Sequence, residues 1–345
     1  MKKSLLALAT LTAFAGAASA QSSVTLFGVV DAAYGHVSAG GKSVTGISNS
    51  GLNSSRLGFR GTEDIGGGMR AGFWIEGQLT NDDGNAAGLT FQRRSTVSLM
   101  GNFGEIRLGR DYTPTFWNTT VYDPFGTNGV GQAMTPGLIS AAGVTTNTTA
   151  VRSNNTIGYF LPGNLGGFTG QVQYGFGEVA SNAPNKGQGN YFGVRVGYAA
   201  GPLAVNFATG NVKGVSGASN VKTSNVGASF DLGFIKPMMF WGQEKARSGA
   251  KVTAWELGLT APIGQGEIRA AYSRYDVARS ANDWNKFAVG YGYNLSKRTQ
   301  LYSTYARVSN KGAQNKAVSN NGLSAGTAAP GGGSNGYEFG VRHAF

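Results

Sequence analysis

Hydrophobic and polar residues alternate with a period of two along most of the chain after Ser23. Successive side chains of a strand point to opposite faces of a sheet, so this pattern predicts β-strands with one apolar and one polar face. The predicted strands run for roughly nine to eleven residues, the length that crosses a bilayer at a tilt, whereas globular strands usually stop near five or six. Clear examples are the segments 168–176, 192–198 and 287–295.

Charged residues occupy the polar parity of many of these strands. A dry core between two packed sheets would not tolerate such charges. The polar face must therefore border water, while the apolar face can border lipid. The charged positions on this parity include Arg56, Arg60, Glu76, Glu105, Arg107, Arg195, Glu256, Glu338 and Arg342.

The connections between strands are of two kinds that alternate along the chain. Seven are short and turn-rich, such as Gly101 to Gly104, and eight are long and polar, such as Gly35 to Leu52. Fifteen connections join sixteen strands, which predicts an all-β fold: a 16-stranded antiparallel transmembrane β-barrel. The last strand, Tyr337 to Phe345, is expected to pair with the first, around Val24 to Ala33, because lipid cannot satisfy a free sheet edge.

One connection, Tyr112 to Val151, is longer than the rest. Its forty residues contain a single formal charge, Asp123. A structureless loop of more than ~15 residues is usually either functional or disordered, and a disordered polar tract would lack apolar anchors. We therefore expect this loop to fold inward and pack inside the barrel. Its apolar anchors are Phe116, Trp117, Tyr122, Phe125, Met134, Leu138 and Ile139.

The N-terminus reads as a secretory signal peptide. Lys2 and Lys3 supply the charged region, Leu5 to Ala15 the apolar region, and Ala18 to Ala20 a small-residue cleavage site. We expect residues 1–20 to be cleaved and residues 21–345 to form the barrel domain.

The chain is basic, with a formal net charge of +12 and a pI near 9.8. Removing Lys2 and Lys3 with the signal peptide leaves +10. The Lys and Arg residues mostly occur singly along the chain, whereas nucleic-acid binding requires a clustered footprint. The charge is consistent with attraction of small anions or with a generic basic surface, and its scatter along the chain argues against nucleic-acid binding. The chain has no Cys, so it has no disulfide framework.

The sequence motifs for catalysis, cofactors or metals lack the context that would make them functional. Gly331 to Gly336 matches a dinucleotide-binding pattern by letter, but no strand leads into it and no helix follows. The two histidines, His36 and His343, are too few for a zinc site. We expect no cofactor and no metal. Two alternatives stay open: a barrel that acts mainly in binding or adhesion through its outer loops, and a barrel enzyme around His36.

Several segments together resemble one known family. The chain is similar to the general, trimeric, 16-stranded porins of Gram-negative outer membranes, and most similar to the β-proteobacterial branch with an anion-selective member. The resemblance spans the mature chain. The segments that carry it are Ser23–Gly28, Ser55–Asp64, Arg93–Leu99, Gly104–Arg110 and Gly340–Phe345.

The resemblance implies an outer-membrane porin, a water-filled channel for passive diffusion of small hydrophilic solutes and ions. It also implies a homotrimer in contact with outer-membrane lipid and lipopolysaccharide, and inorganic anions among the solutes. The loop at Tyr112 to Val151 would be the third loop, which forms the pore constriction, and Phe345 would close the barrel. Carried over by position, the basic wall facing that loop would consist of Arg56, Arg93 or Arg94, and Arg152.

Two features of this expected constriction concern its charged residues: which arginine of the pair faces the lumen, and how many acids the loop carries. If Val97 and Leu99 face outward, parity puts Arg94 in the lumen, whereas the family match points to Arg93. The second feature is a departure from many porins, whose third loop presents several carboxylates, because here Asp123 is the only acid. A basic wall opposite a nearly neutral loop should favour anions.

Overall fold

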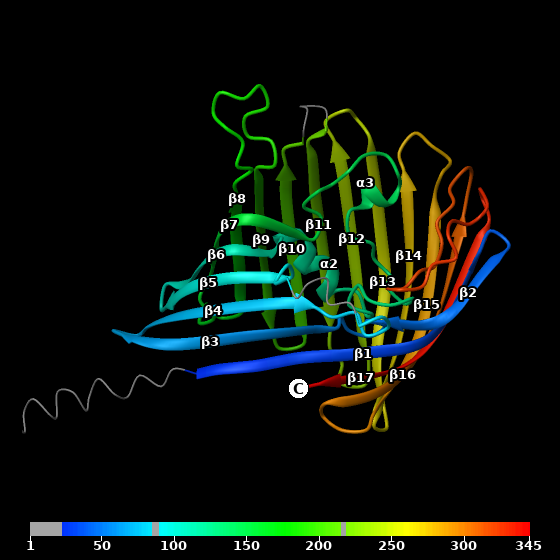
Figure 1. Ribbon diagram of the computed structural model, residues 1–345, viewed down its shortest axis with the longest axis horizontal. Helices are drawn as coiled ribbons and strands as arrows, with labels where there is room; N and C mark the ends of the chain where they lie inside the picture. Colours follow the sequence, from blue (N-terminus) through cyan, green and yellow to red (C-terminus); the bar gives the residue numbers. More distant parts are fainter. Residues whose placement is uncertain (1–22, 85–89, 215–218) are drawn as a thin grey trace, which may run out of the picture.

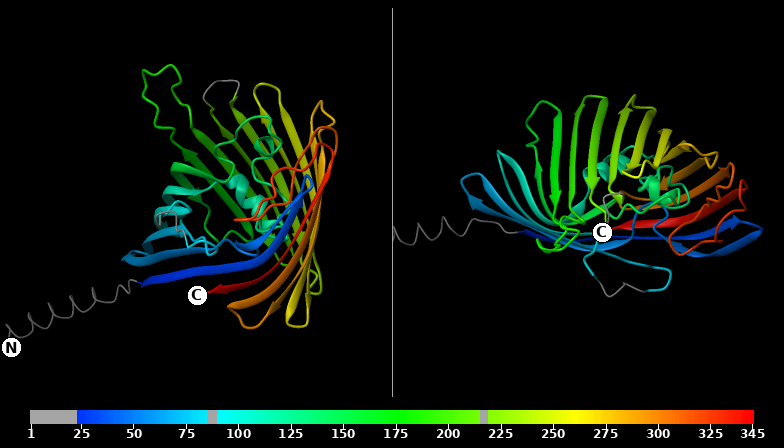
Figure 2. Two further views of the ribbon diagram at one scale, coloured as in Figure 1. Left: turned by 45° about the vertical axis from the view of Figure 1, so that its right-hand side comes forward. Right: turned by 90° about the horizontal axis from the view of Figure 1, so that it is seen from above.

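The computed structural model describes residues 23–84, 90–214 and 219–345. The predicted signal peptide, residues 1–20, lies outside these ranges. A single antiparallel sheet closes on itself into a barrel around two short helices (Figures 1 and 2), which confirms the predicted fold class. Within the described ranges, no helix is both long and apolar enough to cross a membrane. The strands are β1 (Ser23–Ala39), β2 (Lys42–Asn49), β3 (Arg56–Gly66), β4 (Met69–Gln78), β5 (Arg94–Gly101), β6 (Gly104–Tyr112), β7 (Arg152–Phe160), β8 (Phe168–Gly175), β9 (Tyr191–Ala200), β10 (Leu203–Val212), β11 (Val221–Phe230), β12 (Lys236–Ala246), β13 (Lys251–Ile263), β14 (Gly266–Val277), β15 (Trp284–Asn294), β16 (Thr299–Asn310) and β17 (Gly333–Ala344).

The seventeen strands of the described chain fill sixteen positions in the barrel wall, the predicted number. The first half of β1 pairs with β3, with Val29 opposite Arg56, and its second half pairs with β2, with Ala32 opposite Asn49. β2 and β3 are therefore two parts of one barrel strand, separated by residues 50–55.

The expectation of a long polar loop from Gly35 to Leu52 is wrong. β1 continues to Ala39, and β2 begins at Lys42 after a turn at Gly40 and Gly41, whose φ angles of 58° and 78° suit glycine. The other edge of β1 pairs with β17 as far as Ala39 opposite Ser334. Polarity suggested a loop, but a hairpin held at both edges can be polar and still extend the sheet.

The apolar parity of the strands faces outward, as predicted. Phe168 is 63% exposed and Phe287 is 45% exposed, whereas Gln173 on the opposite parity is buried. A continuous belt of exposed apolar side chains around a closed sheet is the lipid-facing surface of a membrane barrel.

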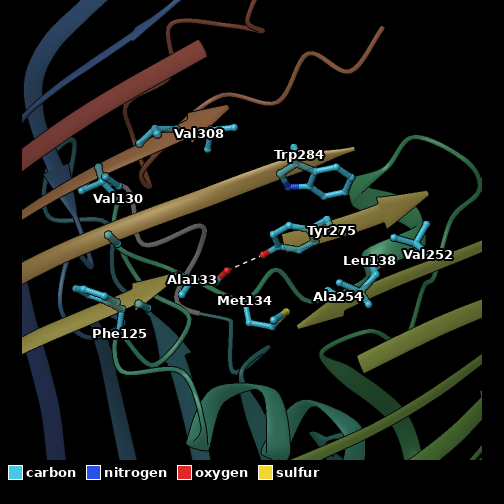
Figure 3. Close-up of a cluster of buried hydrophobic side chains, with 14 of the residues drawn as sticks. Phe125, Val130, Ala133, Met134, Leu138, Val252, Ala254, Tyr275, Trp284 and Val308 are labelled. Carbon is cyan, nitrogen blue, oxygen red and sulfur yellow. Dashed lines mark hydrogen bonds between the residues drawn. The ribbon is translucent and has the colours of Figure 1, made fainter. Parts of the chain in front are cut away.

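Residues 113–151, between β6 and β7, lie inside the barrel, and we call them the inner loop. They contain α2 (Pro114–Val121) and α3 (Leu138–Ala141) (Figure 1). The inner loop packs its apolar side chains against the strand wall, and Figure 3 shows Met134 and Leu138 near Tyr275 and Ala254. Six of the seven predicted anchors are buried, and Trp117 is the exception.

Polar contacts complete this attachment. Tyr275 Oη and Ser273 Oγ both donate to the carbonyl oxygen of Ala133, at 2.6 and 2.7 Å. The Tyr275 ring stacks on Trp284 at 4.4 Å. Because these partners lie in β14 and β15, the inner loop crosses the lumen to reach the far wall.

The barrel closes between β1 and β17. Beyond the last ladder pairs, Phe345 N donates to Gly28 O at 3.1 Å and Gly28 N donates to Phe345 O at 3.0 Å. The Phe345 ring lies directly over Gly28, where any Cβ would collide with it. The terminal residue therefore covers the seam as well as pairing across it.

Deleting Phe345 should lower the yield of assembled barrel, because it removes two backbone hydrogen bonds, worth about 0.5–1.5 kcal/mol each, and the ring over the seam. The measurement is the fraction of outer-membrane protein that shows a heat-modifiable shift on gels. Phe345→Leu keeps both backbone bonds and should assemble better than the deletion. Equal assembly of the deletion variant and the unaltered chain would contradict this role for Phe345.

Candidate functional site

A cavity of about 890 Å³ lies in the lumen between the inner loop and the strand wall. Its described lining contains twice as many arginines as carboxylates. All five predicted selectivity residues border it. The arginines are Arg56, Arg93, Arg94, Arg152, Arg269 and Arg342, and the carboxylates are Glu76, Asp123 and Glu267.

Arg93 and Arg94 both line the cavity, so the choice between them was unnecessary. Val97 and Leu99 face outward, and parity therefore directs Arg94 into the lumen. Arg93 immediately precedes β5, where strand alternation no longer fixes its direction. Its Nε forms an ion pair of 2.6 Å with Glu76 Oε1, which holds the side chain inside the barrel.

Tyr112 brings two of the arginines together. Its hydroxyl oxygen accepts hydrogen bonds of 3.0 Å from both Arg93 Nη2 and Arg152 Nη2. The Arg152 guanidinium also lies over the Tyr112 ring at 4.5 Å, a cation–π contact. Arg152 Nε donates to the carbonyl oxygen of Arg93 at 2.7 Å. Arg152 is thus fixed by neutral acceptors and a ring, whereas Arg93 is held by the Tyr112 hydroxyl and by its ion pair with Glu76.

Arg56 lies on the same wall, in β3. Its Nη1 donates to Asn53 Oδ1 at 2.8 Å and to Ser54 O at 2.9 Å. Its Nε is 3.8 Å from Glu76 Oε1, so Glu76 serves both Arg56 and Arg93. Glu76 and Arg342 were assigned to the lumen by parity, but their place in this site was missed. Recognising it required the strand register that sets neighbouring side chains at one height.

Asp123 borders the cavity, but its carboxylate is engaged within the inner loop. Its oxygens accept from the backbone N–H groups of Phe125, Thr127, Ala133 and Met134, at 2.8 to 3.2 Å. Burial raises the pKa of the Asp123 carboxyl group, and these backbone donors oppose that rise. Asp123 therefore stabilises the backbone conformation of the inner loop through these four hydrogen bonds.

α2 presents the inner loop to the cavity. Thr113 caps the helix by accepting from Phe116 N at 3.3 Å, and Pro114 occupies the first turn. On the wall side, Asn118 Nδ2 donates to Asn206 O at 3.1 Å, and Asn118 Oδ1 accepts from Arg195 Nε at 2.6 Å. These contacts fix which side of α2 faces the lumen.

The sequence of the chain matches the model of one family over residues 7–313, and the description of that family is Gram-negative porin. The chain is 43% identical to outer membrane porin protein 32 of Delftia acidovorans, with all of both chains covered. It is 31% identical to an outer membrane porin protein of Bordetella pertussis, with 89% of this chain and 94% of that protein covered. The chain belongs to the Gram-negative porin family.

Solved structures agree with the fold of this porin. A structure titled as the anion-selective porin from Comamonas acidovorans matches with a TM-score of 0.87 and 41% identity, covering 94% of this chain and all of that chain. A trimer form of OmpT of Vibrio cholerae matches with a TM-score of 0.65 at 15% identity, covering 94% and 99%. The porin is a channel of the outer membrane for passive diffusion, and the cavity lies on its path.

The wall of the porin carries further cations next to the cavity. The Arg94 guanidinium lies 4.5 Å from the centre of the Trp74 ring, and that of Arg60 lies 5.2 Å from it. Arg107 forms ion pairs with Glu105 at 2.9 Å and with Asp111 at 2.5 Å. A row of inward arginines therefore runs along β3, β5 and β6.

Replacing Glu76 with Gln should increase the preference of the porin for anions, because it removes the carboxylate shared by Arg56 and Arg93. A unit charge at 4 Å in water is worth about 1 kcal/mol, so the anion-to-cation permeability ratio should rise by up to about fivefold at low salt. The measurement is the reversal potential of reconstituted channels in a KCl gradient. Glu63→Gln makes the same charge change on the outward parity of β3 and should have little effect. A shift toward cations in the Glu76 variant would contradict the role of Glu76 as a partial neutraliser of the wall.

Proposed function

We propose that this porin is anion-selective, and that Arg56, Arg93, Arg94 and Arg152 produce the selectivity. One observation carries the proposal: in the described lining, arginines outnumber carboxylates, and each carboxylate is engaged. Glu76 pairs with Arg93, Glu267 lies 2.7 Å from Arg269, and Asp123 binds the backbone of the inner loop.

The physical basis is partitioning of ions by the local potential. Guanidinium groups stay charged at all physiological pH values, so the wall is a permanent source of positive potential. In a narrow, water-filled passage, that potential concentrates anions and depletes cations. Inorganic anions and small hydrophilic anionic solutes are therefore the preferred cargo. The similarity to the anion-selective porin from Comamonas acidovorans supports the same conclusion.

Replacing Arg56 and Arg152 together with Gln should shift the reversal potential in a KCl gradient toward the cation side. The fold should persist, because both guanidinium groups border the water-filled cavity. The unaltered channel should also lose selectivity as salt rises, since the Debye length falls from ~10 Å at 0.1 M to ~3 Å at 1 M.

Lys297→Gln with Arg298→Gln is the matched control, because it removes two charges from a short turn outside the cavity. Its selectivity should equal that of the unaltered channel. Cation preference in the unaltered channel, or full anion preference in the Arg56 and Arg152 double variant at low salt, would overturn the proposal.

We infer further that the exported chain loses residues 1–20 and assembles as a homotrimer. Support for the trimer comes from the unequal outer surface. The outward positions Val97 and Leu99 of β5 and Ile106 of β6 are aliphatic, whereas those of β15 include Phe287 and Tyr291. An aromatic belt marks contact with lipid, so the plainer face suits contact with protein. The mass of the unheated protein in detergent tests the trimer. The mass of the denatured chain tests a mature N-terminus at Gln21.

We also propose a contact with lipopolysaccharide on the opposite side of the barrel. Lys222 of β11 lies opposite Lys245 of β12, which lies opposite Lys251 of β13. Like charges directly opposite each other destabilise a sheet. Within the described part of the chain, the recorded ion pairs include none of these three lysines. The row lies four residues beyond the paired Trp241 and Trp255, toward the long connections, where lipid phosphates would neutralise it.

The triple variant Lys222→Gln, Lys245→Gln, Lys251→Gln should retain less lipopolysaccharide through purification in detergent. The measurement is phosphate bound per barrel. Lys186→Gln, Lys311→Gln, Lys316→Gln removes the same charge from the long connections and should retain the normal amount. Equal retention by both variants would contradict the lysine row as the binding surface.

The position of His36 supports a channel over an enzyme. His36 Nδ1 lies 2.7 Å from Thr45 Oγ1, and its ring stacks on that of Tyr337 at 5.3 Å. These neighbours give the histidine a structural role in the hairpin of β1 and β2, away from the cavity. We therefore propose no catalytic activity for this porin.

A further inference from the structure

Trp117 differs from the other aromatic residues of the inner loop. Phe116, Tyr122 and Phe125 are buried, whereas Trp117 is half-buried. Phe116 and Phe125 border the cavity as well, but Trp117 offers it more exposed surface. Sequence reasoning grouped it with the apolar anchors. The structure places it on the open side of α2, where a large apolar surface borders the path of the solute.

The Trp117 side chain sits on a rigid support. The opposite side of α2 is fixed to the wall through Asn118, whose amide contacts Asn206 O and Asn225 Oδ1, both at 3.1 Å. The indole packs nearly perpendicular to the Tyr112 ring, with ring centres 5.3 Å apart. A ring held in this way loses little conformational entropy when a ligand contacts it.

Trp117 differs from Trp74 and Tyr112, two other aromatic residues of the cavity lining, in its contacts with the arginines. The Trp74 ring is covered by Arg94 at 4.5 Å, and the Tyr112 ring by Arg152 at 4.5 Å. Over the residues that the structure describes, the recorded cation–π contacts do not include Trp117. Tyr112 contacts both this indole and the guanidinium of Arg152. The cavity therefore pairs an anion-binding wall with a flat apolar surface.

We propose that Trp117, with Arg93 and Arg152, forms a subsite for aromatic carboxylates. The carboxylate of the solute would accept charge-assisted hydrogen bonds from the arginines. Its ring would pack offset on the indole, the favoured geometry for aromatic pairs. A benzoate-sized solute fits the cavity volume of about 890 Å³. This subsite rests on the proposed anion selectivity and adds a preference among anions.

The test compares benzoate with cyclohexanecarboxylate, which has the same charge and a similar size but no π face. Reconstituted single channels are recorded in KCl with each carboxylate added, and the duration of current blocks is measured. Benzoate should block longer in the unaltered porin. Trp117→Ala should shorten benzoate blocks about fivefold more than cyclohexanecarboxylate blocks, the scale of one aromatic contact beyond the apolar burial that both solutes share.

Trp117→Phe should keep most of the benzoate block, and Trp241→Ala, on the outward face of β12, should keep all of it. Reversal potentials in KCl alone should match across these variants, because none changes a charge. Equal block durations for the two carboxylates in the unaltered porin, or an unchanged benzoate block in Trp117→Ala, would overturn the subsite. Absence of anion preference in the unaltered porin would instead overturn the proposed function. The two failures are therefore distinguishable.

Discussion

The structure depends on one constraint: in lipid, every backbone N–H and C=O group must find a partner within the protein. The sheet meets it by closing, and the last partners in the closure are Gly28 and Phe345. Closure with sixteen strands leaves a lumen too wide for wall side chains alone to fill. Because that lumen holds water, inward positions can carry arginines that would be costly in a dry interior. Closing the sheet to satisfy the backbone hydrogen bonds therefore also creates the wet lumen in which charged side chains are tolerated.

The inner loop narrows the lumen without adding a counter-charge. The carboxylate of its single acid, Asp123, accepts hydrogen bonds from backbone N–H groups of the loop itself. Attachment to the wall uses hydrogen bonds and apolar packing, as at Tyr275 and Trp284 (Figure 3). A second contact joins α3 to β12, where Ile139 N donates to Glu244 Oε2 at 3.0 Å. Asp123 and Glu244 therefore serve the structure of the loop.

The basic wall shows how like charges can be held close together. Carbonyl oxygens, amide oxygens and the hydroxyl of Tyr112 fix the directions of Arg56, Arg93 and Arg152 while their charges persist. Carboxylates neutralise part of the field, because Glu76 pairs with Arg93 and Asp111 lies 4.0 Å from Arg94. The net charge of the site thus reflects a balance between arginines held by neutral groups and arginines compensated by carboxylates. Trp117, on the facing loop, adds an apolar surface to this balance.

The sequence by itself determined the strand number, the outward and inward faces, and the inward loop, because period-two alternation and connection length are local properties. Parity also placed Arg56 at the lumen, while the family resemblance implied Arg152 and left the choice between Arg93 and Arg94 open. Only the tertiary structure decided the direction of Arg93, which lies just outside a strand, and the hairpin of β1 and β2, which pairing with β17 extends. The same holds for the inward-turned carboxylate of Asp123 and the open face of Trp117. Each of these depends on partners distant in sequence or on where a strand begins and ends. The alternation of polar and apolar residues predicts neither the distant partners nor the strand ends.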